Sequence, residues 1–232
     1  MVSVFYRNFA LTILLVNYVN DNVEMKEDDK AVDTEQLILR ASYGEFTTKG
    51  FAGARTTAIA EQAGVTHAML HYYFRTKERL YETVVRQKVN DIGNLVVKAL
   101  GDDSLPLFER LEKGIGTHFD FLCANPELPR FVLSVLSDHP DFLMSMKDEL
   151  HIKLSYVAGG LQSQIDEANS RGECSKADAM MLVLDIASLN IFPFIASPML
   201  ALVFNEAADN RDLFLARRKQ ENINTIINKL KP

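Results

Sequence analysis

The sequence predicts an all-α protein with a small three-helix head near the N-terminus and a larger helical body behind it. The chain has 232 residues, of which 47% are hydrophobic and 24% are charged, and these are ordinary values for a globular protein. Glycine and proline are sparse, with 11 and 7 residues. Apolar residues recur at spacings of three and four, which places them on one face of a helix, and alternating strand-like runs are rare.

Four helix starts can be recognised in the head region from polar residues that can cap them. The expected caps are Asp33 with Thr34, Thr56 or Thr57, Thr66, and Thr76. Glycine often follows the last turn of a helix, so Gly50 and Gly64 are expected to end the first two. The fourth helix should begin at Lys77 and run directly into the body.

Five further helices are expected in the body, from the spacing of their apolar residues. They cover residues 107–122, 131–136, 142–170, 177–195 and 213–230. The segment 177–195 is apolar almost all round, so it should be buried on two sides. The last helix is amphipathic, with an apolar stripe expected along Leu213, Ala216, Gln220, Ile223, Ile227 and Leu230.

Basic residues are concentrated in the head although the chain as a whole has a net charge of −6. Residues 40–88 carry eight Lys and Arg side chains against four Glu, so this segment is positive and the remainder is strongly acidic. A basic module joined to an acidic one can contact phosphate locally while the whole protein stays acidic. The charge pattern therefore permits a nucleic-acid partner.

Residues 55–74 have the pattern of a helix-turn-helix. Ala60 is small enough for two helices to cross closely, and Gly64 tolerates the positive φ of the turn. Ile59, Val65 and Leu70 are apolar anchors on both sides of that turn. A three-helix packing unit without DNA would need the same anchors, but it would not need the polar residues that accompany them.

Those polar residues are the candidate DNA contacts. The N-terminal part of the second helix, with Thr66, His67 and Met69, can face base edges in the major groove. The remaining candidates can reach phosphates, and they are Arg55, Thr56, Thr57, His71, Tyr72, Tyr73 and Lys77.

The segment 34–88 resembles the TetR family of bacterial transcriptional regulators. The residues that carry the resemblance are Phe46, Gly50, Phe51, Thr56, Thr57, Ile59, Ala60, the run from Ala63 to Thr66, Leu70, the run from Tyr72 to Phe74, Lys77, Glu78 and Leu80. Two positions depart from the pattern: Ala68 stands where the family often has glycine, and His71 where it often has tyrosine. Ala68 is still small, and His71 can still donate to a phosphate.

The resemblance implies a repressor that binds double-stranded operator DNA and is released by a small apolar or amphipathic ligand. It implies a homodimer formed through the last two helices, around residues 177–204 and 211–230. It also implies a division into a DNA-binding domain over residues 33–76 and a ligand-binding and dimerisation domain over residues 77–232. A helical module that holds a lipid or a partner protein, without an operator-specific role, is the alternative.

Candidate ligand-binding residues in the body are Phe108, His118, Phe119, Phe131, Tyr156 and Asn190. Aromatic side chains could line an apolar pocket, but they are also ordinary core residues. His118 could read a polar ligand group or be a hydrogen-bonded core histidine. Asp185 and Asn190 interrupt an apolar helix, where they could orient a ligand or pair across the dimer.

No catalytic residues, metal ligands or cofactor are expected from the sequence. It contains no nucleophile elbow, phosphate loop or dinucleotide fingerprint, and its histidines lack metal-ligand spacing. Cys123 and Cys174 are far apart, so neither a disulfide framework nor a zinc site is expected, and a cytoplasmic location is the default.

The first residues are unusual, because residues 9–16 form an apolar run behind Arg7. The run is too short to span a bilayer. Met25 opens a charged stretch typical of a cytosolic start, so residues 1–24 are interpreted as a non-native or flexible extension, with a membrane-surface anchor as the alternative.

Overall fold

The computed structural model describes residues 28–232 as twelve helices, with no strand in that range. The helices are α2 (Asp28–Gly53), α3 (Thr56–Gln62), α4 (His67–Phe74), α5 (Lys77–Leu100), α6 (Leu107–Ala124), α7 (Leu128–Asp138), α8 (Pro140–Met144), α9 (Lys147–Ser170), α10 (Ala179–Ile195), α11 (Ser197–Val203), α12 (Asn205–Asp209) and α13 (Arg211–Leu230). The all-α prediction is confirmed. The expected extension over residues 1–24 lies outside the described residues.

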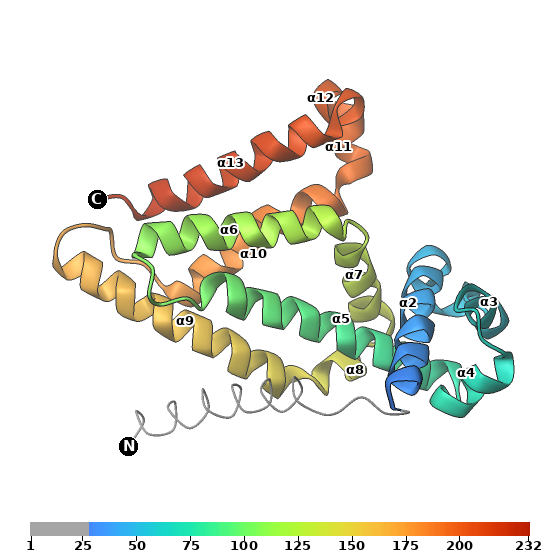
Figure 1. Cartoon of the computed structure of the whole chain (residues 1–232). Coiled ribbons are helices and arrows are strands. Elements are labelled where there is room, and N and C mark those ends of the chain that lie inside the picture. The colour runs from blue at the N-terminus through green and yellow to red at the C-terminus, as the bar shows by residue number, and fades with distance from the viewer. Residues whose placement is uncertain (1–27) are drawn as a thin grey trace, which may run out of the picture.

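The helices form a head and a bundle that are joined by one long helix (Figure 1). Helices α2, α3 and α4 gather at one end, and α5 runs from them into the bundle of α6, α9, α10 and α13. Within the bundle, α5 packs against α6 and α9, while α6 also packs against α10 and α13. The short helices α7 and α8 lie between head and bundle, and α11 and α12 extend from the bundle beside the start of α13.

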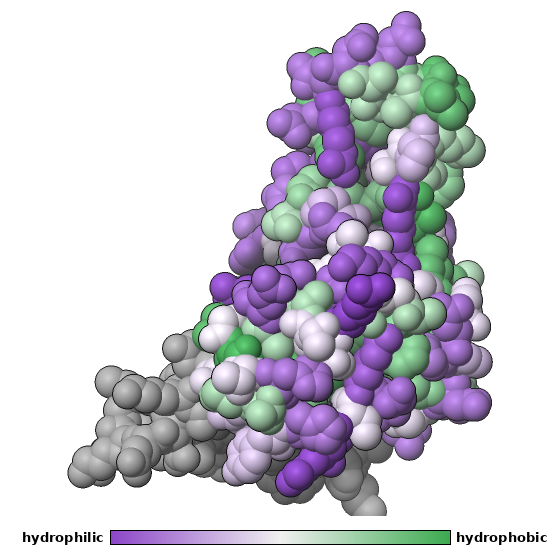
Figure 2. Space-filling model, turned by 90° about the vertical axis from the view of Figure 1, so that its right-hand side faces the viewer, coloured by the Kyte–Doolittle hydropathy of each residue, from purple (hydrophilic) through white to green (hydrophobic). Residues whose placement is uncertain are grey.

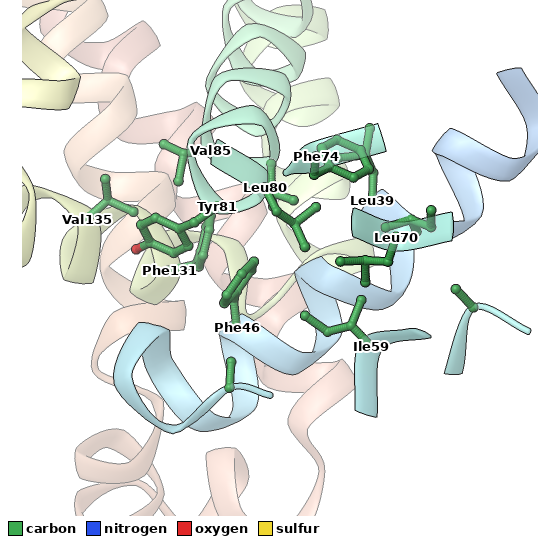
Figure 3. Packing of buried hydrophobic residues seen from close by; sticks show 14 of the residues in the cluster. Leu39, Phe46, Ile59, Leu70, Phe74, Leu80, Tyr81, Val85, Phe131 and Val135 are labelled. Carbon is green, nitrogen blue, oxygen red and sulfur yellow. The ribbon is translucent and has the colours of Figure 1, made fainter. Parts of the chain in front are cut away.

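The hydrophobic core of the head continues into the body (Figure 3). Ile59, Leu70 and Phe74 pack with α2 and with Leu80 at the start of α5. The same cluster continues through Tyr81 to Phe131 of α7. Apolar packing is close and nearly incompressible, so a shift of α7 would displace the side chains of this cluster that pack against the head.

Two caps and the turn of the helix-turn-helix are as predicted. The Thr66 hydroxyl accepts a hydrogen bond from Met69 N at 3.2 Å, and the Thr76 hydroxyl accepts one from Arg79 N at 3.1 Å. These bonds satisfy amide groups that a helix start leaves free. Gly64 has a φ of 68°, the left-handed conformation expected at the turn.

Two expected helix starts are wrong. Helix α2 begins at Asp28, five residues before Asp33, so Thr34 lies inside the helix. Helix α3 is preceded by Arg55, which makes no side-chain cap, so Thr56 is its first helical residue.

The helix expected over residues 142–170 is broken into α8 and α9. The break falls at Ser145 and Met146, and the Met146 side chain is buried in the core cluster shared with the head. The turn between α8 and α9 directs the Met146 side chain into the core, where its flexible thioether can fill the available space.

The buried face of α13 differs from the expected stripe. Leu215, Ile223, Ile226 and Leu230 are buried, whereas Leu213 is 49% exposed. Both faces of this helix carry apolar residues, so periodicity alone could not identify the face that packs inside the protomer.

Among residues 28–232, no single helix is long and apolar enough to cross a membrane. The pair α10 and α11 reaches that length and composition together, but the two helices are bent by 73°. Much of α10 is core of the bundle, with Leu182, Val183, Ile186 and Phe194 buried.

Candidate nucleic-acid interface

The helix-turn-helix is held by its backbone and by two apolar side chains of α4. Val65 N donates to Ala60 O at 3.0 Å, which closes the turn after α3. Leu70 and Phe74 anchor the inner face of α4, with 2% and 3% of their surface exposed. The outer face of α4 is therefore free to meet a ligand as large as a DNA duplex.

That outer face carries four of the candidate contacts. His67, Met69, His71 and Tyr72 are exposed, and Tyr72 is 71% exposed. Tyr73 is half-buried, and its ring packs 5.5 Å from that of Tyr72. In Figure 2, which views the molecule from the side of the head, the lower surface is mostly hydrophilic.

A groove of ≈ 500 Å³ between α3, α4 and the start of α5 collects most of the other candidates. Its walls include Arg55, Thr56, Thr57, His67, His71 and Lys77. Thr66, Met69, Tyr72 and Tyr73 do not line the groove. Six of the ten predicted residues, drawn from three elements, therefore share one concave surface.

Two residues of this groove contact each other directly in the free protein. The Thr56 hydroxyl and His67 Nε2 are 3.0 Å apart. Both side chains thus have a hydrogen-bond partner before any nucleic acid arrives. A base or phosphate that binds here must compete with that bond or extend it.

Lys77 is held at the rim of the groove by α2. Its ammonium nitrogen lies 4.8 Å from the centre of the Phe51 ring and 3.5 Å from the carbonyl oxygen of Ala52. A cation over an aromatic face is attracted by the ring quadrupole. Lys77 also opens α5, and free amide groups at a helix start favour an anion. The arrangement suits a phosphate at this point.

Arg75 and Glu45 belong to the site although they were not among the predicted residues. Arg75 lines the groove and has a φ of 61°, which is uncommon for a residue with a side chain. Glu45 is buried, and its carboxylate accepts hydrogen bonds from Lys49 Nζ, Arg55 N and Gln62 Nε2 at 2.8, 3.2 and 3.3 Å. The bond from Lys49 is the main reason that the pKa of Glu45 is lowered.

Glu45 ties α2 to both ends of α3, and so it positions Arg55 at the edge of the groove. The signal in the sequence was a carboxylate directly before Phe46, at a core-facing position of the first helix. For Arg75 the signal in the sequence was a basic residue directly after α4.

The candidate ligand residues of the body are not brought together as a group. His118 and Asn190 do meet, with Asn190 Nδ2 3.2 Å from His118 Nδ1. Phe119 packs on Phe194, and Phe131 packs between Tyr43 and Tyr81. Phe108 lies at the edge of the cluster between α5, α6 and α9, while Tyr156 is exposed.

His118 is a hydrogen-bonded core histidine. Burial lowers its pKa to about 4, because the charged imidazolium would lose its hydration. Asn190 also donates to Ile115 O at 3.0 Å and accepts from Asn222 Nδ2 at 2.9 Å. Asp185 forms an ion pair with Lys229 of the same chain.

The described part of the chain contains no cluster of three or more side chains that could hold a metal ion. Cys123 is exposed and Cys174 is buried, and both are free thiols.

Fold and site together define a helix-turn-helix protein. Residues 38–84 match the family model for bacterial regulatory proteins of the tetR family. The HTH-type transcriptional regulator RutR of Escherichia coli strain K12 is 34% identical over 140 residues, which cover 59% of this chain and 58% of RutR. The HTH-type transcriptional repressor SCO4008 of Streptomyces coelicolor is 30% identical over 99 residues, covering 43% of this chain and 47% of that protein. The chain thus matches about half the length of these relatives.

Solved structures extend the likeness over the whole fold. A tetR-family transcriptional regulator from Mesorhizobium loti superposes with a TM-score of 0.62 at 15% identity, covering 90% of this chain and all of the other. The transcriptional regulator SCO4942 from Streptomyces coelicolor gives 0.59 at 21% identity, covering 86% of this chain and 99% of the other. Residues 38–84 are thus similar in sequence to bacterial regulatory proteins of the tetR family, and the chain shares the fold of these solved structures.

Proposed function

We propose that this protein is a homodimeric transcriptional repressor that binds double-stranded operator DNA through α4. Residues 33–76 would form the DNA-binding domain and residues 77–232 the ligand-binding and dimerisation domain. A regulator that binds chromosomal DNA acts in the cytoplasm. The observation that carries the proposal is the groove at α3, α4 and the start of α5, where polar and basic side chains face outward around an anchored recognition helix.

The proposed roles follow from position. Thr66, His67 and Met69 occupy the cap and first turn of α4, where a helix lying in the major groove meets base edges. Arg55, Lys77 and the exposed Tyr72 surround that turn and can contact phosphates on either side.

A dimer would bring two recognition helices to successive major grooves. Its proposed interface is the outer face of α10 and α13, where Met180, Met181, Leu184, Phe192 and Leu213 are each at least 41% exposed. Helix α11 continues this apolar surface with Leu202, which is 87% exposed. Exposed apolar area of this extent is typical of an interface. In Figure 2 a group of strongly hydrophobic atoms lies at the upper right, among hydrophilic ones, near the height of α11 and α12 in Figure 1.

Release by a small apolar or amphipathic ligand requires a path from body to head. The aromatic cluster of Phe46, Phe51, Tyr81 and Phe131, with His139, supplies one, since Tyr81 lies 4.9 Å from both Phe46 and Phe51 and 6.0 Å from Phe131. His139 lies 5.3 Å from Phe51 and 5.2 Å from Tyr81. A ligand that shifts α7 would therefore move the ring on which Lys77 rests.

The test is a binding titration of the full chain with labelled duplexes taken from upstream of its own gene, against scrambled duplexes of the same length. The proposal expects saturable binding, at least a thousandfold tighter on one upstream duplex than on scrambled DNA at the same salt concentration. Equal affinity for all duplexes would contradict an operator-specific role and favour the alternative of a lipid- or protein-binding module.

A further inference from the structure

A second concave site lies in the body, between the turn that joins α5 to α6 and the middle of α9. It has a volume of ≈ 310 Å³, at the lower end of the range for small-molecule sites. Its lining is Gly101, Asp103, Arg110, Ser155, Tyr156, Gly159 and Gly160. None of these residues belongs to the groove in the head.

Arg110 is the unusual member of this site. Only 1% of its surface is exposed, and its guanidinium is held by neutral acceptors. Nε donates to Leu100 O at 2.8 Å, and Nη1 donates to the side-chain oxygen of Gln164 at 3.1 Å. Gln164 is itself fixed, because its amide donates to the carbonyl oxygens of Asp103 and Leu105 at 3.2 and 2.9 Å.

The positive charge of Arg110 has no partner at ion-pair distance among residues 28–232. Buried charges in proteins are normally paired, because removing a charge from water is costly. Burial lowers the pKa of Arg110, and the negative charges of Asp103 and Asp102 act against that effect. Asp102 is already engaged, by the Ser104 hydroxyl at 2.6 Å and by Lys113 at 3.6 Å.

The free edge of the guanidinium points toward a bare stretch of α9. A Cβ added at Gly160 would lie 3.1 Å from Nη2 of Arg110 and 3.6 Å from Nη1. Two consecutive glycines inside a helix cost stability, about 1 kcal/mol each relative to alanine. Here Gly160 leaves the space beside the guanidinium free of a side chain, and Nη2 makes no hydrogen bond within the described residues.

We propose that this groove binds a small molecule through a single carboxylate. The carboxylate oxygens would accept hydrogen bonds from Nη1 and Nη2 of Arg110, with the hydroxyls of Ser155 and Tyr156 on the same wall. Arginine presents its N–H groups in a planar fork that matches a carboxylate. A monoanion fits better than a phosphate dianion, because Asp103 lines the groove and repels negative charge.

The use of this site as an effector site rests on the proposed function, whereas its existence as a binding site does not. Arg110 Nε holds the carbonyl oxygen of Leu100, the last residue of α5. The first residue of the same helix, Lys77, lines the groove in the head. A ligand on Arg110 would thus act on one end of a helix whose other end faces DNA.

Calorimetric titration of the full chain tests the binding site without DNA. The probes are sodium acetate and sodium benzoate, with benzamide as the neutral match of benzoate and inorganic phosphate as the other oxyanion. The proposal expects saturable binding of the carboxylates and none of benzamide. Gly160→Ala keeps Arg110 and favours the helix, and it should weaken binding about tenfold, which is ~1.4 kcal/mol. Tyr156→Phe, which removes the hydroxyl on the wall of the groove, should also weaken carboxylate binding.

The matched control is Gly116→Ala, since an added Cβ there meets nothing within 4 Å and Gly116 does not line this groove. Its affinity for benzoate should equal that of the unaltered chain. Equal losses in Gly160→Ala and Gly116→Ala would overturn the proposal, as would binding of benzamide or a preference for phosphate. Absence of any saturable binding would also overturn the proposal, and the role of Arg110 would then be the hydrogen bond to Leu100 O. If the protein binds benzoate but not operator DNA, the carboxylate site is supported and the proposed function is contradicted.

Discussion

Lys77 and His67 line one groove, but the free protein holds them differently. Lys77 rests on the Phe51 ring through its charge, whereas His67 shares a hydrogen bond with Thr56. A charge at a helix start acts on any phosphate, while an imidazole in the first turn of α4 can discriminate between bases. Removing either side chain should therefore weaken DNA binding, but in a different way for each.

Replacing Lys77 with alanine should weaken binding to all duplexes alike. The loss of one phosphate contact should lower the slope of log affinity against log salt by about one unit. Titrations on operator and scrambled DNA at several salt concentrations measure this slope. Lys98→Ala, near the far end of α5, is the control and should leave the slope unchanged. A slope that stays the same in Lys77→Ala would remove Lys77 from the phosphate contacts.

Replacing His67 with alanine should affect only duplexes that contain the base it contacts. The expected cost is on the order of 1–3 kcal/mol on the operator, with little change on scrambled DNA and little change in the salt slope. Parallel titrations of both duplexes at one salt concentration separate the two effects. Equal losses on operator and scrambled DNA would show that His67 does not read a base.

His118 should make the stability of the fold depend on pH. Its pKa is about 4 in the folded protein and near the ordinary value of 6.5 once unfolded, so the unfolded chain binds a proton first as pH falls. Stability should therefore be complete above about pH 6.5 and decline toward pH 4, with a loss of about 3 kcal/mol from this residue. Denaturant unfolding at fixed protein concentration measures it. His118→Gln should show a shallower decline, and parallel profiles would contradict the assignment.

Helix α2 contains a break that its neighbours in space require. Gly50 has φ of 68° and ψ of 172°, a conformation that is almost exclusive to glycine. The break turns Phe51 back, so that its ring lies 6.3 Å from Phe46 and 4.9 Å from Tyr81. The position of Lys77 over Phe51 therefore depends on one residue of another helix.

Gly50→Ala should destabilise the head, because alanine is strained in that conformation although an added Cβ would meet nothing within 4 Å. The expected cost is about 1–3 kcal/mol in the free energy of unfolding, together with weaker DNA binding. Gly44→Ala, in the regular part of α2 and equally uncrowded, is the matched control and should be neutral or stabilising. Equal effects of the two substitutions would show that the break is not needed.

For the whole molecule, the outer face of α10 should control assembly. Leu184 is 55% exposed on this face. Leu184→Asp should lower the mass measured by light scattering from twice 26.1 kDa toward 26.1 kDa, and it should weaken operator binding at the same time. A buried unpaired charge is costly at an interface, and a single head has too few contacts for tight binding.

Leu136 of α7 is 51% exposed and outside the proposed interface, so Leu136→Asp is the control and should remain a dimer. Ile223 would be a poor choice for this test, since it is buried inside the protomer and its substitution would disrupt the core itself. A Leu184→Asp protein that stays dimeric would place the interface elsewhere.

The helical class, the helix-turn-helix and its caps at Thr66 and Thr76 could be predicted from the amino-acid sequence alone. Each of these rests on short-range chemistry: apolar periodicity, a hydroxyl three residues before an amide, and a glycine at a positive φ. These signals lie within a few residues of the feature they specify. They could therefore be read without knowing what packs against the segment.

The contacts between residues far apart in the chain could not be predicted and are set by the folded molecule. It brought Glu45 to the start of α3, seated Lys77 on Phe51, and joined His118 to Asn190 across two helices. It also separated α8 from α9 at Met146, and it buried Arg110 beside Gly160 with no counter-ion among residues 28–232. The physical reason is that burial, charge pairing and the choice of the helix face that packs inward depend on residues far along the chain. Local spacing carries no information about those residues.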